Sequence, residues 1–148
     1  MVADDVMVTL IDRRMTKAGF EEYLRWIDND LRTWPEDRQR VVFYSLMSVS
    51  DFGPGQRKQL AKLLNRYRHK LKTITSGYAL VTPSAIGRGL LTAVFWLAPP
   101  GYPTHICASP EEGFLWLAQY SKNPDVEAWI AGYERCRREF TELEQVSA

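Results

Sequence analysis

The segment VVFYSL, Val41 to Leu46, is almost continuously apolar and is rich in β-branched and aromatic residues. This composition favours a β-strand. A strand without strict alternation of polar and apolar residues is typical of a parallel sheet that is covered on both faces. The sequence therefore predicts that Val41–Leu46 is an interior strand of such a sheet.

Three further short segments have strand character, and amphipathic segments separate them. The other strands are predicted at Val6–Ile11, Tyr78–Thr82 and Thr104–Ala108. Helices are predicted where apolar residues recur at spacings of three and four, namely over Thr16–Thr33, Gly55–Lys72 and Ala85–Leu97. Each connection is long enough for a parallel crossover. We expect an α/β fold with a mainly parallel four- to five-stranded sheet and helices packed on it.

Two helix starts follow the last predicted strand. Ser109 can accept a hydrogen bond from a free N–H group at a helix start, Pro110 suits the first helical position, and Glu112 can bond the N–H group of the serine. Asn123-Pro124-Asp125 repeats this arrangement, and an amphipathic helix is predicted from Val126. We expect an α/β domain over residues 1–120 and an extra C-terminal helix over residues 121–148 that packs on the domain or on a partner.

Length, charge and hydropathy limit the class of protein. The chain has 148 residues, two cysteines and a net charge of +1, which fits one domain and gives no overall field that favours nucleic acid. Few cysteines and no recognisable signal peptide favour a cytoplasmic protein. The longest apolar run, Gly89–Pro100, is shorter than the roughly 20 residues that cross a bilayer, so a buried helix is expected. Four aromatic residues of apolar runs are expected in the core: Phe95, Trp96, Phe114 and Trp116.

The loop after the central strand, Ser48–Gly55, contains hydroxyl groups and glycines but lacks the features of a phosphate-binding loop. No Gly-Lys-Ser/Thr follows, and Pro54 removes one backbone N–H group. Ser48, Ser50 and Asp51 are expected to cap the helix that follows. Phosphorylation of Ser50 is the alternative, because a phosphate is stabilised near a helix N-terminus.

The helix after this loop has the strongest local charge bias. Gln56–Lys72 contains seven Lys or Arg residues and no acidic residue. Lys58, Lys62, Arg66 and Lys70 recur every four residues and form a stripe opposite the leucines. A solvated outer face explains this stripe, and a docking surface for an acidic protein or for phosphates is the alternative. The candidate partner-binding residues are Ser50, Asp51, Arg57, Lys58, Lys62 and Arg66.

No residues have the spacing of a catalytic or metal site. His105 and Cys107 point to the same face of a predicted strand, but two ligands do not make a metal site, so strand packing is expected. A Gly-x-Ser-x-Gly motif is absent. The carboxylates of the first helix, such as Glu21 and Asp28, lie on its polar side. We expect a non-catalytic protein that uses no cofactor and no metal.

Two long runs resemble the bacterial STAS-like domains, which are similar to the anti-sigma-factor antagonists and are often grouped with CRAL-TRIO lipid-binding domains: GQRKQLAKLL and GYALVTPSAIGRGLLTAVFWLAPPGYPTHICASPEEGFLWL. The resemblance covers roughly Val6–Gln119. In the antagonists, a partner kinase phosphorylates a serine in the loop after a central strand. The corresponding segment here is Ser48–Gly53, with Ser50 as the candidate. The resemblance implies a non-catalytic signalling domain that contacts a protein, often through self-association.

Two functions are therefore expected, and the first is preferred. The first is a cytoplasmic regulatory domain that binds a protein partner, or a second copy in a dimer, through Ser48–Gly55 and the basic helix. It does not bind nucleic acid and has no transmembrane segment. The second is a carrier of a small apolar ligand or lipid, with Leu90–Pro103 lining a cavity. A third function, an enzyme, has no positive support in the sequence.

Overall fold

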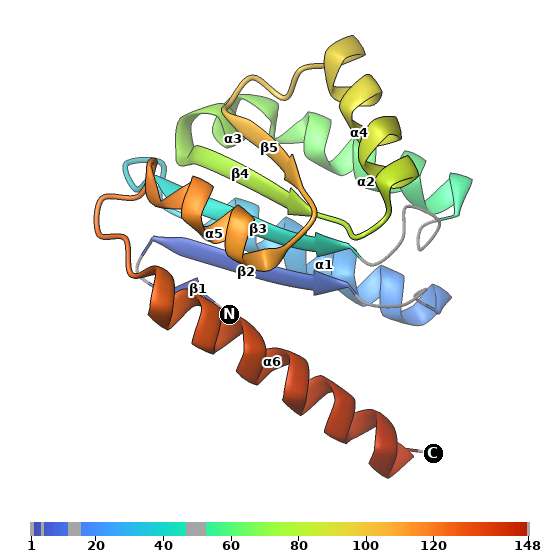
Figure 1. The fold of residues 1–148 in the computed structure, drawn as a ribbon. Coiled ribbons are helices and arrows are strands. Elements are labelled where there is room, and N and C mark those ends of the chain that lie inside the picture. Colours follow the sequence, from blue (N-terminus) through green and yellow to red (C-terminus); the bar gives the residue numbers. More distant parts are fainter. Residues whose placement is uncertain (1, 4, 12–15, 47–52, 148) are drawn as a thin grey trace.

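One sheet holds the fold together, and its strands lie side by side in the order in which they occur in the chain (Figure 1). The computed structural model describes residues 2–3, 5–11, 16–46 and 53–147. Its strands are β1 (Val2–Ala3), β2 (Val6–Ile11), β3 (Arg40–Leu46), β4 (Thr75–Val81) and β5 (Thr104–Cys107). The short β1 is antiparallel to β2, and the other neighbours are parallel. The predicted α/β fold with a mainly parallel sheet is confirmed.

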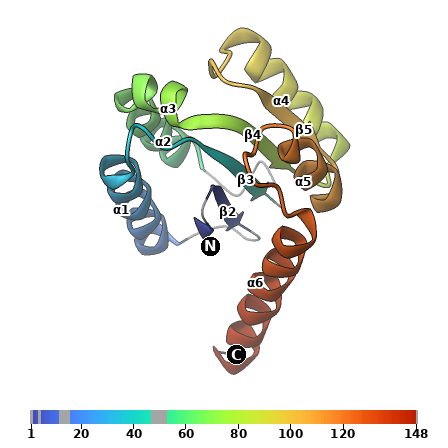
Figure 2. The same ribbon diagram turned by 90° about the vertical axis from the view of Figure 1, so that its left-hand side faces the viewer.

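The helices divide between the two faces of the sheet. They are α1 (Lys17–Thr33), α2 (Pro54–Arg66), α3 (Arg68–Ile74), α4 (Ala85–Leu97), α5 (Pro110–Ala118) and α6 (Val126–Ser147). Right-handed crossovers that all step in one direction across a sheet leave their helices on the same face. Accordingly α1, α2 and α3 cover one face and α5 and α6 the other, while α4 lies near the β5 edge (Figure 2).

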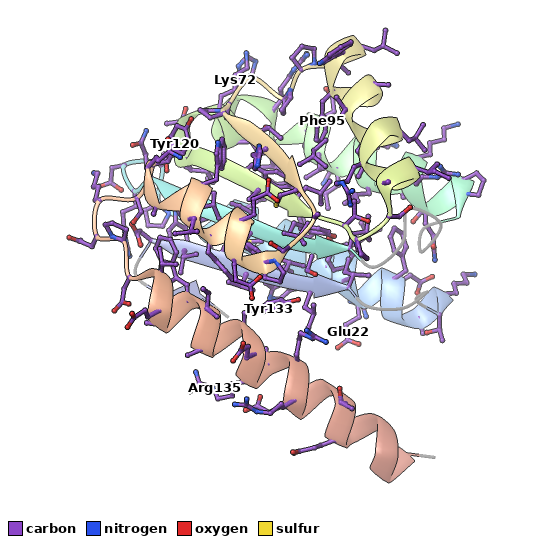
Figure 3. All side chains as sticks on the ribbon, in the orientation of Figure 1. Glu22, Lys72, Phe95, Tyr120, Tyr133 and Arg135 are labelled. Atoms are coloured by element: carbon purple, nitrogen blue, oxygen red, sulfur yellow. The ribbon has the colours of Figure 1, made fainter. Side chains whose placement is uncertain are left out.

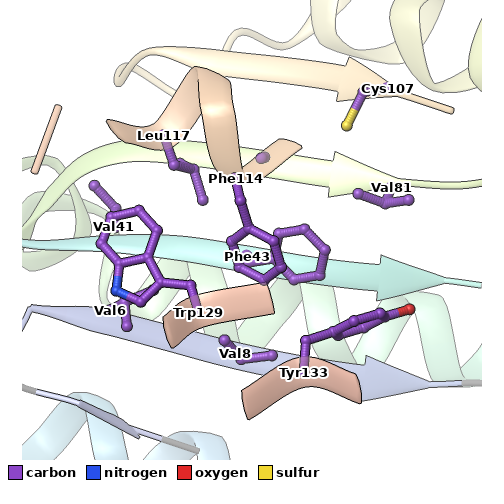
Figure 4. Close-up of a cluster of buried hydrophobic side chains, with 11 residues drawn as sticks. Val6, Val8, Val41, Phe43, Val81, Cys107, Phe114, Leu117, Trp129 and Tyr133 are labelled. Carbon is purple, nitrogen blue, oxygen red and sulfur yellow. The ribbon is translucent and has the colours of Figure 1, made fainter. Parts of the chain in front are cut away.

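The strand β3 contributes to a core on each face, which explains its apolar run. Side chains alternate along a strand, so Val41 and Phe43 face α5 and α6, whereas Tyr44 and Leu46 face the other helices. The aromatic ring of Phe43 stacks on that of Phe114 with centroids 3.9 Å apart (Figure 4). Every position of β3 is thus specified by packing on one side or the other.

The helix α6 completes the first core with two aromatic side chains. Trp129 and Tyr133 are buried against Phe114, and the Tyr133 ring also meets Phe43 edge-on at 5.4 Å. Asp125 caps this helix by accepting from the N–H group of Ala128 at 3.0 Å. The first half of the extra C-terminal helix therefore packs on the α/β layers.

The glycine at position 113 allows α5 to approach the sheet. A Cβ atom at Gly113 would lie 3.0 Å from Cε2 of Phe43 and 3.2 Å from Sγ of Cys107. Nearly all real contacts are longer, so a side chain here would displace the helix from the strands. The close stacking of Phe114 on β3 depends on this missing side chain.

Most predicted helix boundaries are confirmed, and one capping detail is wrong. Thr16 accepts from the N–H group of Gly19, and Ser109 accepts from that of Glu112 at 3.3 Å. The Glu112 carboxylate was expected to bond the N–H group of Ser109. It bonds instead to the N–H group of Ala108 at 3.3 Å and to His105 at 3.0 Å.

The helix predicted over Gly55–Lys72 is two helices. The chain turns at Tyr67, with φ −98° and ψ 16°, and its hydroxyl donates to Asp28 on α1 at 2.9 Å. This contact fixes the break between α2 and α3. The residue at the N-cap of α2 is Gly53. Ser48, Ser50 and Asp51, which were predicted to cap this helix, lie outside the described residues.

The expected burial of α4 and of Trp96 is wrong. Trp96 is 82% exposed and Leu97 is 88% exposed, while Phe95 on the other side of the helix is partly buried. Phe114 is buried as predicted, and Trp116 is partly buried and stacks on the His105 ring at 5.2 Å. The helix α4 is apolar on both its inner and its outer side, so only one side can face the protein.

Replacing Phe114 tests the importance of the aromatic core. Phe114→Ala removes a fully buried ring, so we expect the free energy of unfolding to fall by about 3–5 kcal/mol. Leu115→Ala changes the next residue of α5, which is 62% exposed, and should alter stability by about 0.5 kcal/mol at most. Urea unfolding followed by circular dichroism measures both. Equal effects of the two substitutions would contradict the packing of α5 on β3.

Candidate functional site

The four described cations that were predicted to bind a partner do not all lie on one side of α2. Ser50 and Asp51 lie outside the described residues, and Arg57, Lys58 and Lys62 are exposed on α2. Arg66 lies beside α1, where its guanidinium is 3.4 Å from the carboxylate of Asp28. Lys62 shares that side, since it lines the same shallow groove between α1 and α2. These cations therefore face in more than one direction around α2, as a solvated helix surface does.

The pair His105 and Cys107 belongs to the packing of β5. His105 is bonded to Glu112, and this bond holds the pKa of the Glu112 carboxyl below its ordinary value. The thiol of Cys107 donates to the carbonyl of Leu80 at 3.7 Å. Burial, with a contribution from the Glu112 charge, raises the pKa of Cys107 to about 12, so the thiol is a poor nucleophile. Among the described residues, no three His, Cys, Asp or Glu side chains gather as a metal ion would require.

The structure has a cavity on the face of the sheet that α1, α2, α3 and α4 cover. Its volume is about 270 Å³. Its floor consists of side chains of β2, β3 and β4, and its walls come from the helices and the segment before β5. The lining residues are Met7, Tyr23, Ile27, Asp30, Leu31, Arg40, Val42, Tyr44, Leu46, Leu60, Leu64, Leu71, Thr75, Tyr78, Leu80, Leu91, Phe95, Pro100 and Tyr102. Nearly all of this surface is aliphatic or aromatic.

Four tyrosines line one part of the cavity. The hydroxyl groups of Tyr23 and Tyr44 are hydrogen-bonded to each other. The ring of Tyr78 stacks on Tyr44 with centroids 6.3 Å apart and lies 6.0 Å from that of Tyr102. Burial is the main cause that raises the pKa of all four above the ordinary value of 10.0. These hydroxyl groups are therefore uncharged at neutral pH.

A buried ion pair forms part of the cavity lining. Arg40 is only 2% exposed, and its Nη1 lies 2.9 Å from Oδ1 of Asp30, while its Nη2 bonds the other carboxylate oxygen. The guanidinium also lies over the ring of Trp34 at 4.3 Å. Its Nε–H group is buried and has no hydrogen-bond partner in the described part of the chain. The pair is neutral as a whole and leaves this N–H group unbonded.

Sequence reasoning found only part of this cavity. The segment expected to line it, Leu90–Pro103, supplies Leu91, Phe95, Pro100 and Tyr102. Sequence reasoning did not identify Arg40, Tyr44 and Tyr78 as cavity residues. One sequence signal could have indicated them: each is a polar residue in or next to a strand that is predicted to be buried. Such residues require hydrogen-bond partners in the interior.

Comparison of the chain with protein-family models, with curated proteins and with solved structures finds no match. The resemblance to STAS-like domains therefore stays a prediction. Among the described residues, no helix combines the length and the apolar character needed to cross a membrane.

The tyrosines predict how stability changes at alkaline pH. In the unfolded chain a tyrosine ionises near pH 10, whereas burial raises the pKa of Tyr78 well above that value. Below pH 10 the tyrosine is protonated in both states, and its contribution to the free energy of unfolding is fully present. Above pH 10 only the unfolded chain loses the proton, so the free energy of unfolding falls by up to about 1.4 kcal/mol per pH unit for each such tyrosine. Tyr78→Phe should match the wild type at pH 8 and lose less stability by pH 11. Urea unfolding at both pH values measures this, and equal losses would contradict it.

The ion pair predicts a double-mutant result. Arg40→Met leaves the Asp30 carboxylate without its partner, so we expect the free energy of unfolding to fall by about 3–5 kcal/mol. Adding Asp30→Leu removes the isolated charge and should restore most of that loss, because both side chains are largely buried. Urea unfolding of the wild type, both single variants and the double variant gives the coupling. If the double variant were as unstable as Arg40→Met alone, an unpaired Asp30 carboxylate would not be the cause of the instability.

Proposed function

We propose that the protein binds a small, uncharged and largely apolar ligand in the cavity between the sheet and α1, α2, α3 and α4. The observation that carries this proposal is the cavity itself, which combines apolar walls with a few converging polar groups. Ligand sites have this composition, in which apolar surface supplies affinity and isolated polar groups orient the ligand. A well-packed core of this size would leave few voids larger than a water molecule.

The cavity volume sets the size of the ligand. An apolar cavity of about 150 Å³ stays dry and takes up benzene. The cavity here, at about 270 Å³, has room for a larger molecule, such as a substituted aromatic ring or a short acyl chain. This is near the lower limit for ligand pockets, which begin at roughly 300 Å³. A complete phospholipid would not fit inside.

The polar groups of the cavity favour a neutral ligand with a hydrogen-bond acceptor. The four tyrosine hydroxyl groups are uncharged, and Asp30 already neutralises Arg40. A charged ligand would add a charge without a partner in a largely apolar space, which is costly. The tyrosine hydroxyl groups can donate to a carbonyl, ester, ether or hydroxyl oxygen of the ligand.

The same groups support binding more than catalysis. A general base needs a pKa near the working pH, whereas burial raises the pKa of each cavity tyrosine further from neutrality. The Cys107 thiol packs in the core on the opposite face of the sheet. We therefore infer a carrier or sensor domain. Protein interaction through Ser48–Gly55, the first expectation from the sequence, stays a prediction, because residues 48–52 lie outside the described part.

A cavity-filling variant tests the proposal. Leu91 lines the cavity from α4, so Leu91→Trp places a larger side chain in the ligand space. We expect binding of the neutral fluorescent probe N-phenyl-1-naphthylamine to weaken by about tenfold or more, as lost apolar contacts imply. Fluorescence titration of the full chain measures the affinity.

The matched control is Leu115→Trp, the same change at an exposed residue of α5 on the other face. This variant should bind the probe as the wild type does. Thermal unfolding of both variants shows whether each one is folded. A folded Leu91→Trp variant with wild-type probe affinity, or a wild type that binds no probe, would overturn the proposed function.

A further inference from the structure

The outer side of α4 is an apolar surface exposed to solvent. Ile86 is 86% exposed and Leu90 is 51% exposed, and they lie on the same helix as the exposed Trp96 and Leu97. Every exposed position described between residues 85 and 99 is apolar or glycine: Ala85, Ile86, Gly89, Leu90, Ala93, Trp96, Leu97, Ala98 and Pro99. Apolar patches of this kind mark contact with a protein or a membrane.

The part of the chain that carries this surface is strongly basic. From Gly53 to Pro110 there are eight Lys or Arg residues and no Asp or Glu. The rest of the chain has 11 Lys or Arg and 18 Asp or Glu, so the near-zero net charge conceals a positive part and a negative part. A local field of this sign attracts an anionic surface even when the whole protein is nearly neutral.

Two of these cations lie on elements that adjoin α4. Leu60 and Leu64 line the cavity from α2. Residues three, four and seven positions apart share one side of a helix, which places Arg57 on that same side. Lys72 lies against Gly101, just after α4, where a Cβ atom would be 2.3 Å from its Cε. Figure 3 shows Lys72 and Phe95 toward the same end of the molecule.

The one charged residue of α4 does not interrupt the surface. The guanidinium of Arg88 donates to the backbone carbonyls of Thr82 and Pro83 at 3.0 and 2.8 Å. Thr92, the one hydroxyl residue of α4, donates to the carbonyl of Arg88. Among the described residues of the outer side, the indole N–H group of the exposed Trp96 is therefore the one side-chain hydrogen-bonding group between the apolar residues.

We propose that α4 docks its outer side, defined by Ile86, Leu90, Trp96 and Leu97, into the surface of a bilayer that contains anionic lipids. A bilayer surface needs no hydrogen bonds from the inserted residues, whereas protein interfaces have a polar rim. Tryptophan favours the membrane–water interface. At 13 residues, α4 is about 20 Å long and lies in the interface plane without spanning it.

The basic residues around α4 supply the lipid selectivity of this surface. Lys and Arg side chains near a bilayer interact with anionic headgroups over about one Debye length. Arg57, Lys58 and Lys72 are all exposed, and the sequence from Gly53 to Pro110 contains no Asp or Glu. Docking therefore depends on two contributions. The apolar side chains of α4 insert into the bilayer, and the cations bind anionic headgroups.

Vesicle binding tests the proposal. Full-length protein is sedimented with vesicles of phosphatidylcholine alone and with vesicles that also contain phosphatidylserine. We expect binding to the mixed vesicles and at least about tenfold weaker binding to the neutral ones, with loss at high salt. Trp96→Ser combined with Leu97→Ser should reduce binding to the mixed vesicles about tenfold or more, and both residues are exposed, so the fold is kept.

Two controls separate the apolar and the charged contributions. Leu115→Ser removes an exposed leucine from the opposite face and should leave vesicle binding unchanged. Arg57→Glu with Lys58→Glu should weaken binding to the mixed vesicles, whereas Arg135→Glu with Arg138→Glu, a charge change of equal size on exposed residues of α6, should not. Equal effects of the two charge reversals would overturn the assignment of the basic surface to α2.

The outcomes distinguish this proposal from the proposed function. Leu91→Trp fills the cavity from the inner side of α4, so it should weaken probe binding and leave vesicle binding intact. Failure of the wild type to bind mixed vesicles, or full binding by the Trp96/Leu97 variant, would overturn membrane docking and leave the cavity proposal untouched. A concentration-dependent dimer that dissociates when Trp96 and Leu97 are replaced would assign the surface to a second copy and would likewise overturn it.

Discussion

The handedness of the strand connections is the constraint on which the rest of the structure depends. Because β2, β3, β4 and β5 are parallel and adjacent in chain order, each right-handed crossover returns on the same side of the sheet. That side receives α1, α2, α3 and α4, and the other is closed only by α5 and α6. The two faces consequently have different packing. The face under α5 and α6 has stacked aromatic rings at 3.9 Å, and the face under the four crossover helices retains a cavity.

The cavity is a consequence of how β3 and β4 divide their side chains. Alternation sends Val41, Phe43 and Ala79 toward α5 and α6, and sends Tyr44, Tyr78 and Leu80 toward the crossover helices. On the crossover side α4 meets the sheet mainly near its β5 edge, so space remains between the helices and the tyrosine rings. The ion pair of Arg40 and Asp30 is also buried on this side, where its charges cancel. The result is a neutral interior space rather than a filled core.

Much of the fold could be predicted from the sequence, but the site could not. The strand at Val41–Leu46 and the cap at Ser109 are local features, and local physics specifies them. The break at Tyr67 depends on a hydroxyl contact with Asp28, 39 positions away, and has no Gly or Pro signal. The cavity joins side chains of seven elements and one loop, so no window of sequence contains it. In α4 the periodicity failed for another reason: a helix that is apolar all round gives no information about which side is buried.

The helix α4 is apolar both on the side that faces the cavity and on the side that faces solvent. A helix needed only to cover the sheet would have polar residues outward, as α1 does, because exposed apolar residues add nothing to folding and promote association. Here Leu91 and Phe95 face the cavity while Trp96 and Leu97 face solvent. Together, the two proposals describe a route in which an apolar ligand passes from a bilayer along the outside of α4 into the cavity without crossing bulk water. In that route the cations between Gly53 and Pro110, which the net charge of +1 conceals, attract the anionic lipid.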